Sequence, residues 1–139
     1  MDRCVDATGI VAGRLASNTA KQLLKGDNVT IVNAEKAIVS GDKVYTENMF
    51  KEKVERGEPY SGPFYPKEPD RILRRMVRGM LPFHTNRGRE AFLRLRVYKS
   101  VPAELKSAKA EKPSYKSRLT AKKMEIGEIS VRLGVKKTW

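Results

Sequence analysis

The stretch CVDATGIVAGRLASNTAKQLLKGDNVTIVN, residues 4–33, decides the expected fold. Residues 4–7 and the β-branched run 29–33 are expected to form strands. Between them, apolar and small residues recur at every third or fourth position, which predicts a helix over residues 13–25 with one buried face. Gly26 can end that helix in the left-handed conformation. A strand, a helix and a strand in this order indicate an α/β fold.

Further strands and helices are expected after residue 33. Residues 37–39 are expected to form another short strand, and residues 43–56 have the composition of a helix. Helices are also predicted over residues 70–81, which end before a proline, and over residues 86–92. Residues 93–99 alternate between apolar and polar side chains, which is typical of a strand. We expect it to join the same sheet.

Length and composition divide the chain into a core and an extension. The 139 residues suit one domain, while 32% of them are charged, more than in a typical globular domain. We expect an α/β core over residues 1–101 and a basic C-terminal extension over 102–139. Within the extension, residues 106–118 resemble a polar, extended arm, and residues 126–133 have helical spacing that predicts a short terminal helix.

The positive charge is confined to one half of the chain. Residues 1–70 hold 10 lysines and arginines against 11 acidic residues, whereas residues 71–139 hold 19 against 5. The whole formal net charge of +13 therefore lies in the second half. Such a surface attracts polyanions by counterion release. Nucleic acid is the first candidate partner and an anionic membrane surface is the second.

Several protein classes are disfavoured. No apolar run approaches the roughly 20 residues that span a bilayer, and the first residues lack the features of a signal peptide, so we expect a soluble, cytoplasmic protein without a membrane partner. Cys4 is the only cysteine and His84 the only histidine, which excludes an internal disulfide and a Cys/His zinc site. We expect no metal, no cofactor and no small-molecule substrate.

The predicted helix over residues 70–81 is the most informative element. At 100° per residue its four arginines fall within an arc of about 100°, and apolar residues fill the inner side. After Asp70 the next acidic residue is Glu90, so i, i+4 ion pairs cannot neutralise this face. Arginine binds phosphate oxygens in pairs and can stack on unpaired bases. The helix therefore predicts an RNA-binding face.

The following turn extends the basic surface. Arg87 and Arg89 flank Gly88, which would let the backbone come close to a phosphate. Thr85 and Asn86 can cap the next helix, whose N-terminus favours anions.

The turn from Thr8 to Arg14 invites comparison with a nucleotide-binding loop. Its glycines are one residue too close for the Walker spacing, Arg14 takes the place of the lysine, and Leu15 replaces the magnesium-binding Ser or Thr. Arg14 near a helix N-terminus could still hold an RNA phosphate, although a purely structural turn is favoured. No serine lies in a nucleophile elbow. We therefore predict that the chain is not an enzyme.

Several segments in order resemble one known family, the thirteenth universal protein of the large ribosomal subunit, in its archaeal and eukaryotic branch. The resemblance runs from about residue 5 to residue 98. It is carried by Val5-Asp6-Ala7, Gly13-Arg14-Leu15-Ala16-Ser17, Asn33-Ala34-Glu35-Lys36, Ser40-Gly41, Gly62-Pro63-Phe64-Tyr65-Pro66, Val77-Arg78-Gly79-Met80-Leu81-Pro82 and Gly88-Arg89.

The resemblance implies a three-layer α/β/α sandwich around a mostly parallel four-stranded sheet. It also implies binding to large-subunit rRNA, contact with neighbouring large-subunit proteins, and a role in subunit assembly and translation, with no cofactor. The family's basic motif corresponds to Arg74, Arg75, Arg78, Arg87 and Arg89.

From charge and resemblance together, we expect a structural rRNA-binding protein. The alternatives are a nucleotide-hydrolysing enzyme that uses the first turn and a regulatory RNA binder acting away from the ribosome. The residues expected to contact RNA are Arg71, Arg74, Arg75, Arg78, Arg87, Arg89, Arg94, Arg96, Lys99, Arg14, Lys122 and Lys123.

Overall fold

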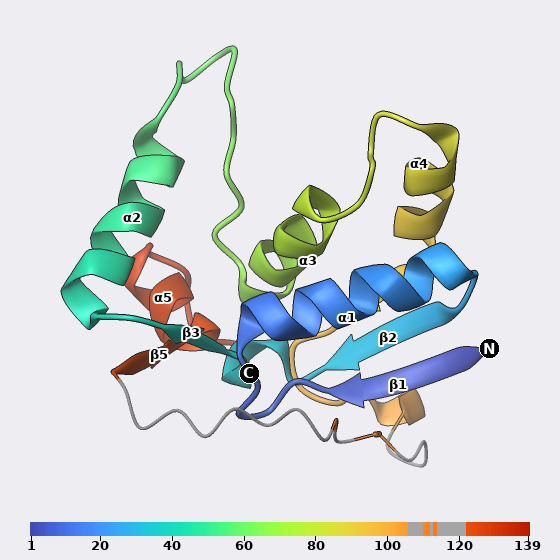
Figure 1. Ribbon diagram of the computed structural model, residues 1–139. Helices are drawn as coiled ribbons and strands as arrows, with labels where there is room; N and C mark the ends of the chain where they lie inside the picture. Colours follow the sequence, from blue (N-terminus) through green and yellow to red (C-terminus); the bar gives the residue numbers. More distant parts are fainter. Residues whose placement is uncertain (106–109, 112, 114–121) are drawn as a thin grey trace.

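The computed structural model describes residues 1–105, 110, 111, 113 and 122–139, which form a mixed α/β structure (Figure 1). The elements follow the chain in the order β1 (Asp2–Asp6), α1 (Ala12–Lys25), β2 (Asn28–Val32), η1 (Ala34–Lys36), β3 (Ile38–Ser40), α2 (Lys43–Glu55), α3 (Pro69–Gly79), α4 (Asn86–Leu93), β4 (Leu95–Val97), η2 (Ala103–Leu105), β5 (Lys123–Glu125) and α5 (Ile126–Arg132). The α/β class predicted from the sequence is therefore confirmed.

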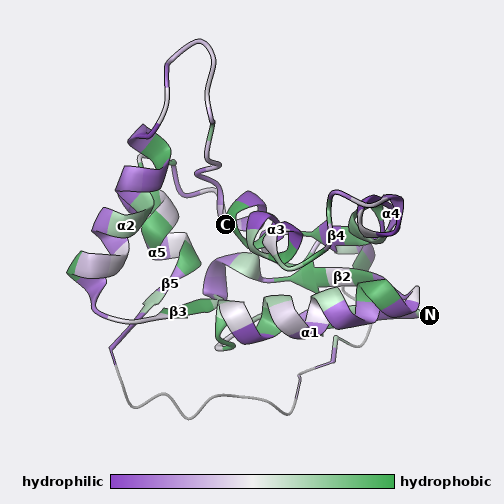
Figure 2. Cartoon of the chain, turned by 45° about the horizontal axis from the view of Figure 1, so that its top comes forward, coloured by the Kyte–Doolittle hydropathy of each residue, from purple (hydrophilic) through white to green (hydrophobic). Residues whose placement is uncertain are grey.

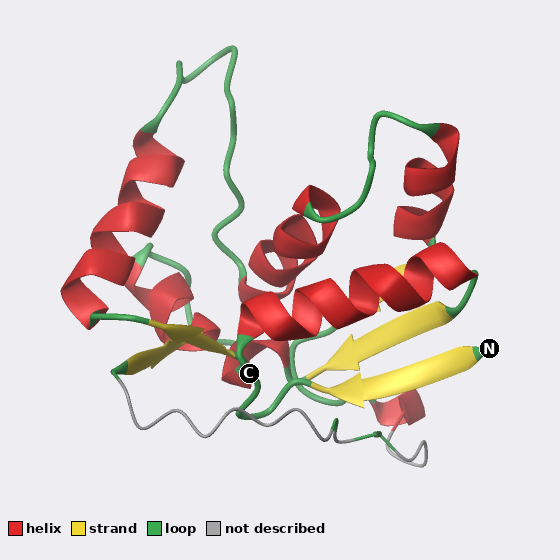
Figure 3. Cartoon of the chain, viewed as in Figure 1, coloured by secondary structure: helices red, strands yellow, loops and turns green. Residues whose placement is uncertain are grey.

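The first strand, helix and strand form the predicted parallel unit. β1 pairs with β2 and β2 with β4, all in parallel, so that Val5 lies opposite Ile31 and Ile31 opposite Val97. α1 ends at Gly26, which takes the left-handed conformation (φ 104°) expected of a C-terminal glycine. Helices α1, α3 and α4 pack on one another and on one face of this sheet (Figure 3).

The prediction of a four-stranded sheet is wrong. After β2 the chain turns away at Asn33, which has a positive φ of 56°, and passes through η1 before β3. β3 then pairs antiparallel with β5 in a separate two-stranded sheet. At the free edge of β1, Glu111 forms a single parallel bridge, donating its amide to the Cys4 carbonyl at 2.8 Å. The described residues thus give three parallel strands and a two-stranded antiparallel pair.

The three-layer arrangement is also not found. No α-helix of the described residues packs on the second face of the three-stranded sheet, where only the short η2 lies nearby. The side chains on that face include Asp2, Asn28, Thr30 and Arg96, since each pairs in register with a neighbour on the same side. Among the described residues, helices therefore cover one side of this sheet.

The hydrophobic core lies between this sheet and the helices. Figure 2 shows β2 and β3 as mainly apolar and α2 as mainly polar. The end of the chain contributes to the same core, because Met124, Ile126 and Ile129 are at most 1% exposed and pack with the residues of α1 and α3. The predicted terminal helix is confirmed as α5. The predicted extended arm, residues 106–118, lies outside the described residues except for 110, 111 and 113.

The prediction of a strand after α4 needs correction. The predicted strand over residues 93–99 is shorter, because Leu93 ends α4 and β4 spans only Leu95–Val97. Leu93 is 76% exposed rather than facing the core. None of the helices among the described residues has the length and apolar character needed to cross a membrane.

Candidate nucleic-acid interface

The arginines of α3 lie together on its outer side. Pro69 occupies the first turn, and Ile72, Leu73 and Val77 are completely buried against the core. Because these apolar residues fix the rotation of the helix, the remaining side must face solvent. Arg71, Arg74 and Arg75 are exposed on this side, and Arg78 is half-buried.

A groove of about 210 Å³ runs beside these arginines. Among the described residues no acidic side chain lines it, so the charged groups around it are all positive. Its lining consists of Pro66, Arg71, Arg74, Arg75, Arg78 and Phe92.

Two phenylalanines hold arginines of α3 in place. The Arg74 guanidinium lies over the Phe92 ring, 4.7 Å from its centroid, and the Arg78 guanidinium lies over the Phe83 ring at 4.9 Å. The two rings meet edge to face, with centroids 5.6 Å apart. Such contacts fix a flexible side chain while its N–H groups stay available. The aromatic pair therefore prepares two guanidinium groups for an anionic partner.

The turn before α4 is built as a helix cap. Thr85 precedes α4, and its Oγ1 accepts a hydrogen bond from the Gly88 amide at 3.2 Å, as the sequence predicted. Gly88 itself is buried against the Pro82 carbonyl, where a Cβ would lie 2.0 Å from the oxygen. The glycine therefore serves close packing within the protein, not the phosphate approach that we expected.

Three predicted RNA-binding arginines near α4 donate to carbonyl groups of the protein. The exposed Arg87 donates to Leu24 and the exposed Arg89 to the Phe83 carbonyl, both at 3.3 Å. The half-buried Arg94 donates to the Leu23 carbonyl at 2.9 Å. The guanidinium groups of Arg87 and Arg94 thus meet the C-terminal end of α1, whose last carbonyls lack helical partners.

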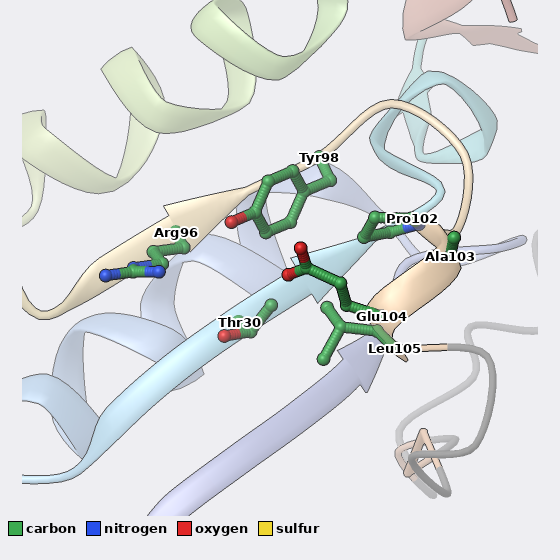
Figure 4. A pocket seen from close by; sticks show the side chains of 7 residues that line it. All are labelled: Thr30, Arg96, Tyr98, Pro102, Ala103, Glu104 and Leu105. Atoms are coloured by element: carbon green, nitrogen blue, oxygen red, sulfur yellow. The ribbon is translucent and has the colours of Figure 1, made fainter.

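Arg96 points to a different part of the molecule. It is exposed on β4, opposite Thr30 of β2, on the face of the sheet that lacks helices. A hollow of about 430 Å³ opens there, and Figure 4 shows Arg96 from β4 and Tyr98, just after β4, beside Thr30 from β2 and residues 102–105. Arg96 does not line the groove at α3, although it lines a neighbouring hollow of about 330 Å³ together with Arg74.

Lys99 and Arg14 also lie apart from the groove. Lys99 forms an ion pair with Glu68 at 2.9 Å, just before α3, and this contact lowers the pKa of the Glu68 carboxyl. Arg14 is exposed in the first turn of α1. In the turn before it, Gly9 donates to the Lys36 carbonyl and Ile10 is buried, so this turn is used within the fold.

The family model described as Ribosomal protein L13 matches residues 2–104. The chain belongs to the ribosomal protein L13 family. It is 47% identical over 136 residues to a "Large ribosomal subunit protein uL13" of Methanosarcina barkeri, covering 95% of this chain and 97% of that protein. A protein of the same name from Archaeoglobus fulgidus is 45% identical, over 94% of this chain and 86% of the relative.

The part that matches the L13 family contains most of the predicted RNA-binding residues. The α3 groove, the turn before α4 and β4 all lie within residues 2–104, whereas Lys122 and Lys123 lie beyond them. Lys122 is bound to Asp42 in an ion pair of 2.9 Å, which raises the pKa of the lysine. Lys123 is exposed on β5, opposite Ser40. These two lysines therefore lie apart from the α3 groove, at the β3–β5 pair.

Phe83, Phe92 and Pro66 of this L13-family chain were not predicted from the sequence to belong to the candidate interface. Their spacing relative to the arginines follows no helical or strand period, because Phe92 reaches Arg74 through tertiary packing of α4 on the sheet. A compositional signal existed nonetheless, since aromatic residues interleaved with arginines are typical of RNA-binding surfaces.

Proposed function

We propose that the chain is a structural constituent of the large ribosomal subunit, where it binds large-subunit rRNA and supports subunit assembly and translation. In this role it turns over no substrate and works without a cofactor. Neighbouring large-subunit proteins are its further partners. Relatives that share 45–47% of its residues carry the name of a large-subunit protein, which supports this assignment.

The groove beside α3 is the observation that carries the proposal. Four arginines line it without an acidic residue, and two of them are held against aromatic rings. Fixed guanidinium groups lose little conformational entropy when they bind phosphate, and their planar forks match its oxygens. The charge is thus mounted on a folded surface, which favours recognition of RNA shape.

The other predicted residues divide into supporting roles. Arg14, Arg87, Arg89 and Arg96 are exposed, and we propose that they contact phosphates around the groove or on a second RNA segment. Arg94 and Lys99 are engaged within the protein, and we assign them to holding α1 and α3 in place. Lys122 and Lys123 would meet a separate part of the rRNA.

The salt dependence of binding tests the proposal. Affinity for a large-subunit rRNA fragment is measured by filter binding at 50 and 200 mM salt. With about six to ten phosphate contacts, affinity should fall by roughly three to five orders of magnitude, as estimated for duplex sites. Sedimentation with the large subunit in a sucrose gradient is the second measurement. A salt-independent affinity, or migration only with free protein, would contradict the proposal.

A further inference from the structure

The groove beside α3 combines positive charge with flat apolar surfaces. Pro66 and Phe92 line it together with the arginines. Phosphate recognition requires the cations and the ring that holds Arg74, but it gives no use to the proline or to the rest of the apolar lining in the same hollow. The lining therefore fits a ligand that has both an anionic part and a flat, uncharged part.

Arg74 is placed to stack a second ring. One side of its guanidinium lies over Phe92, yet the residue is exposed. Arg74 also lines a neighbouring hollow of about 330 Å³ beside β4, together with Leu93 and Tyr98. A planar guanidinium that is stacked on one side leaves its other side free for a base.

We propose that this groove takes one unpaired RNA base, which stacks on Arg74 while the flanking phosphates bind Arg71, Arg75 and Arg78. The inference rests on the rRNA binding proposed above and names the part of the RNA that this site reads. Paired bases hide their faces inside the helix, so only a bulged or looped-out nucleotide can supply a free ring.

The size of the groove supports a single base. At about 210 Å³ it is smaller than the roughly 300–1,000 Å³ of ordinary small-molecule pockets, so one ring system suits it better than a whole free ligand. The four surrounding cations complement a backbone that carries one negative charge per nucleotide.

Two RNA hairpins with the same number of phosphates test this inference. One hairpin carries a single unpaired adenosine, and the other carries an abasic nucleotide at the same position. The full-length protein is titrated with each RNA, and the ratio of the two affinities is the readout. Arg74→Lys keeps the charge but loses the planar group, and Phe92→Leu keeps apolar volume but loses the ring.

The wild-type protein should bind the hairpin with the adenosine on the order of ten-fold more tightly, as expected for one stacked base. Arg74→Lys and Phe92→Leu should bring the ratio close to one. Arg71→Lys is the matched control, because this arginine lines the same groove but contacts no ring among the described residues, and it should keep the ratio. Circular dichroism checks that Phe92→Leu is folded, and Arg74→Lys alters only an exposed side chain.

Equal affinity of the wild-type protein for the two hairpins would overturn the base site. So would binding of the rRNA fragment without binding of either hairpin, or a ratio that Arg74→Lys leaves unchanged. Loss of salt-sensitive binding to the rRNA fragment itself is a different result, and it would remove the proposed function.

Discussion

The guanidinium of Arg94 donates a hydrogen bond of 2.9 Å to the main-chain carbonyl of Leu23, which lies 71 positions earlier in the chain. Leu23 belongs to the last turn of α1, where carbonyl groups lack helical partners and the helix dipole is negative. The Leu23 carbonyl also accepts a hydrogen bond from the Gly26 amide at 3.1 Å, so Arg94 adds a second donor and a positive charge at this end of the helix. The bond also ties α1 to the junction between α4 and β4.

We therefore expect Arg94→Ala to reduce stability. Loss of a hydrogen bond from a charged donor should lower the free energy of unfolding by about 1.5–3 kcal/mol. Arg96→Ala is the control, because this exposed arginine two residues later should change it by less than about 0.5 kcal/mol. Urea unfolding followed by circular dichroism measures both. If the two variants lost the same free energy of unfolding, the hydrogen bond from Arg94 to Leu23 would not stabilise the fold.

RNA affinity should depend on the α3 groove more than on the lysines near β5. Arg74→Ala/Arg78→Ala removes two ring-held cations and should reduce the slope of log affinity against log salt by about two. Lys122→Ala/Lys123→Ala should reduce it by one or less, because Lys122 is already paired with Asp42. Gel shifts over a salt series compare the two double variants. A larger effect of the lysine pair would move the interface to the β3–β5 site.

Gly88 should not tolerate a side chain. In Gly88→Ala the new Cβ would meet the Pro82 carbonyl oxygen at 2.0 Å, so the turn before α4 must shift. We expect a loss of about 1–3 kcal/mol in the free energy of unfolding. Gly13→Ala, in α1, has open space around the new Cβ and should raise stability by up to about 1 kcal/mol. Thermal unfolding of both variants tests the contrast, and a stable Gly88→Ala would refute the packing argument.

The ion pair between Glu68 and Lys99 should make stability depend on pH. The pKa of Glu68 is lowered in the folded protein, chiefly by the Lys99 hydrogen bond, so its contribution is present above the ordinary value of 4.5 and disappears as pH falls through the lowered value. Both side chains are partly exposed, so the effect should stay below about 1 kcal/mol.

Glu68→Gln tests this dependence. The variant should be less stable than the wild type at pH 7 and equally stable near pH 2, as measured by urea midpoints. Glu90→Gln, an exposed change on α4, is the control. A difference between Glu68→Gln and wild type that is the same at both pH values would rule out the linkage.

The last helix should be essential to the core. Ile129 is 1% exposed and lies in the main hydrophobic cluster, so Ile129→Ala should cost about 2–5 kcal/mol. Val131→Ala, on the exposed side of α5, should cost much less. Denaturant unfolding separates the two, and a mild effect of Ile129→Ala would mean that α5 is only loosely attached.

Local patterns in the sequence predicted the helices well. The buried residues of α1 and α3 repeat with helical spacing, and Pro69 and Gly26 mark ends that depend on backbone chemistry alone. The β3–β5 pairing could not be predicted in this way. β5 has one buried apolar residue, Met124, between two charged ones, and its partner lies far earlier in the chain.

The sequence could predict which basic residues belong to the candidate site, but not which groups they contact after folding. Arg94 and Arg96 look equivalent in the sequence, since both alternate with apolar residues before or within a strand. Their neighbours differ only after folding, when Arg94 meets the end of α1 and Arg96 faces the open side of the sheet. The rings under Arg74 and Arg78 depend on the same long-range packing.

The pairing of β3 with β5 also sets the order of events during synthesis. Lys122 and Asp42, which flank this pair, are 80 residues apart. At about 5–20 residues per second, the later strand is made roughly 4–16 s after the earlier one. α5, which packs on the arginine-bearing helix α3, follows later still. An unfinished chain that lacks β5 and α5 therefore presents its arginines on an incomplete core, and the candidate interface is complete only after α5 has been made.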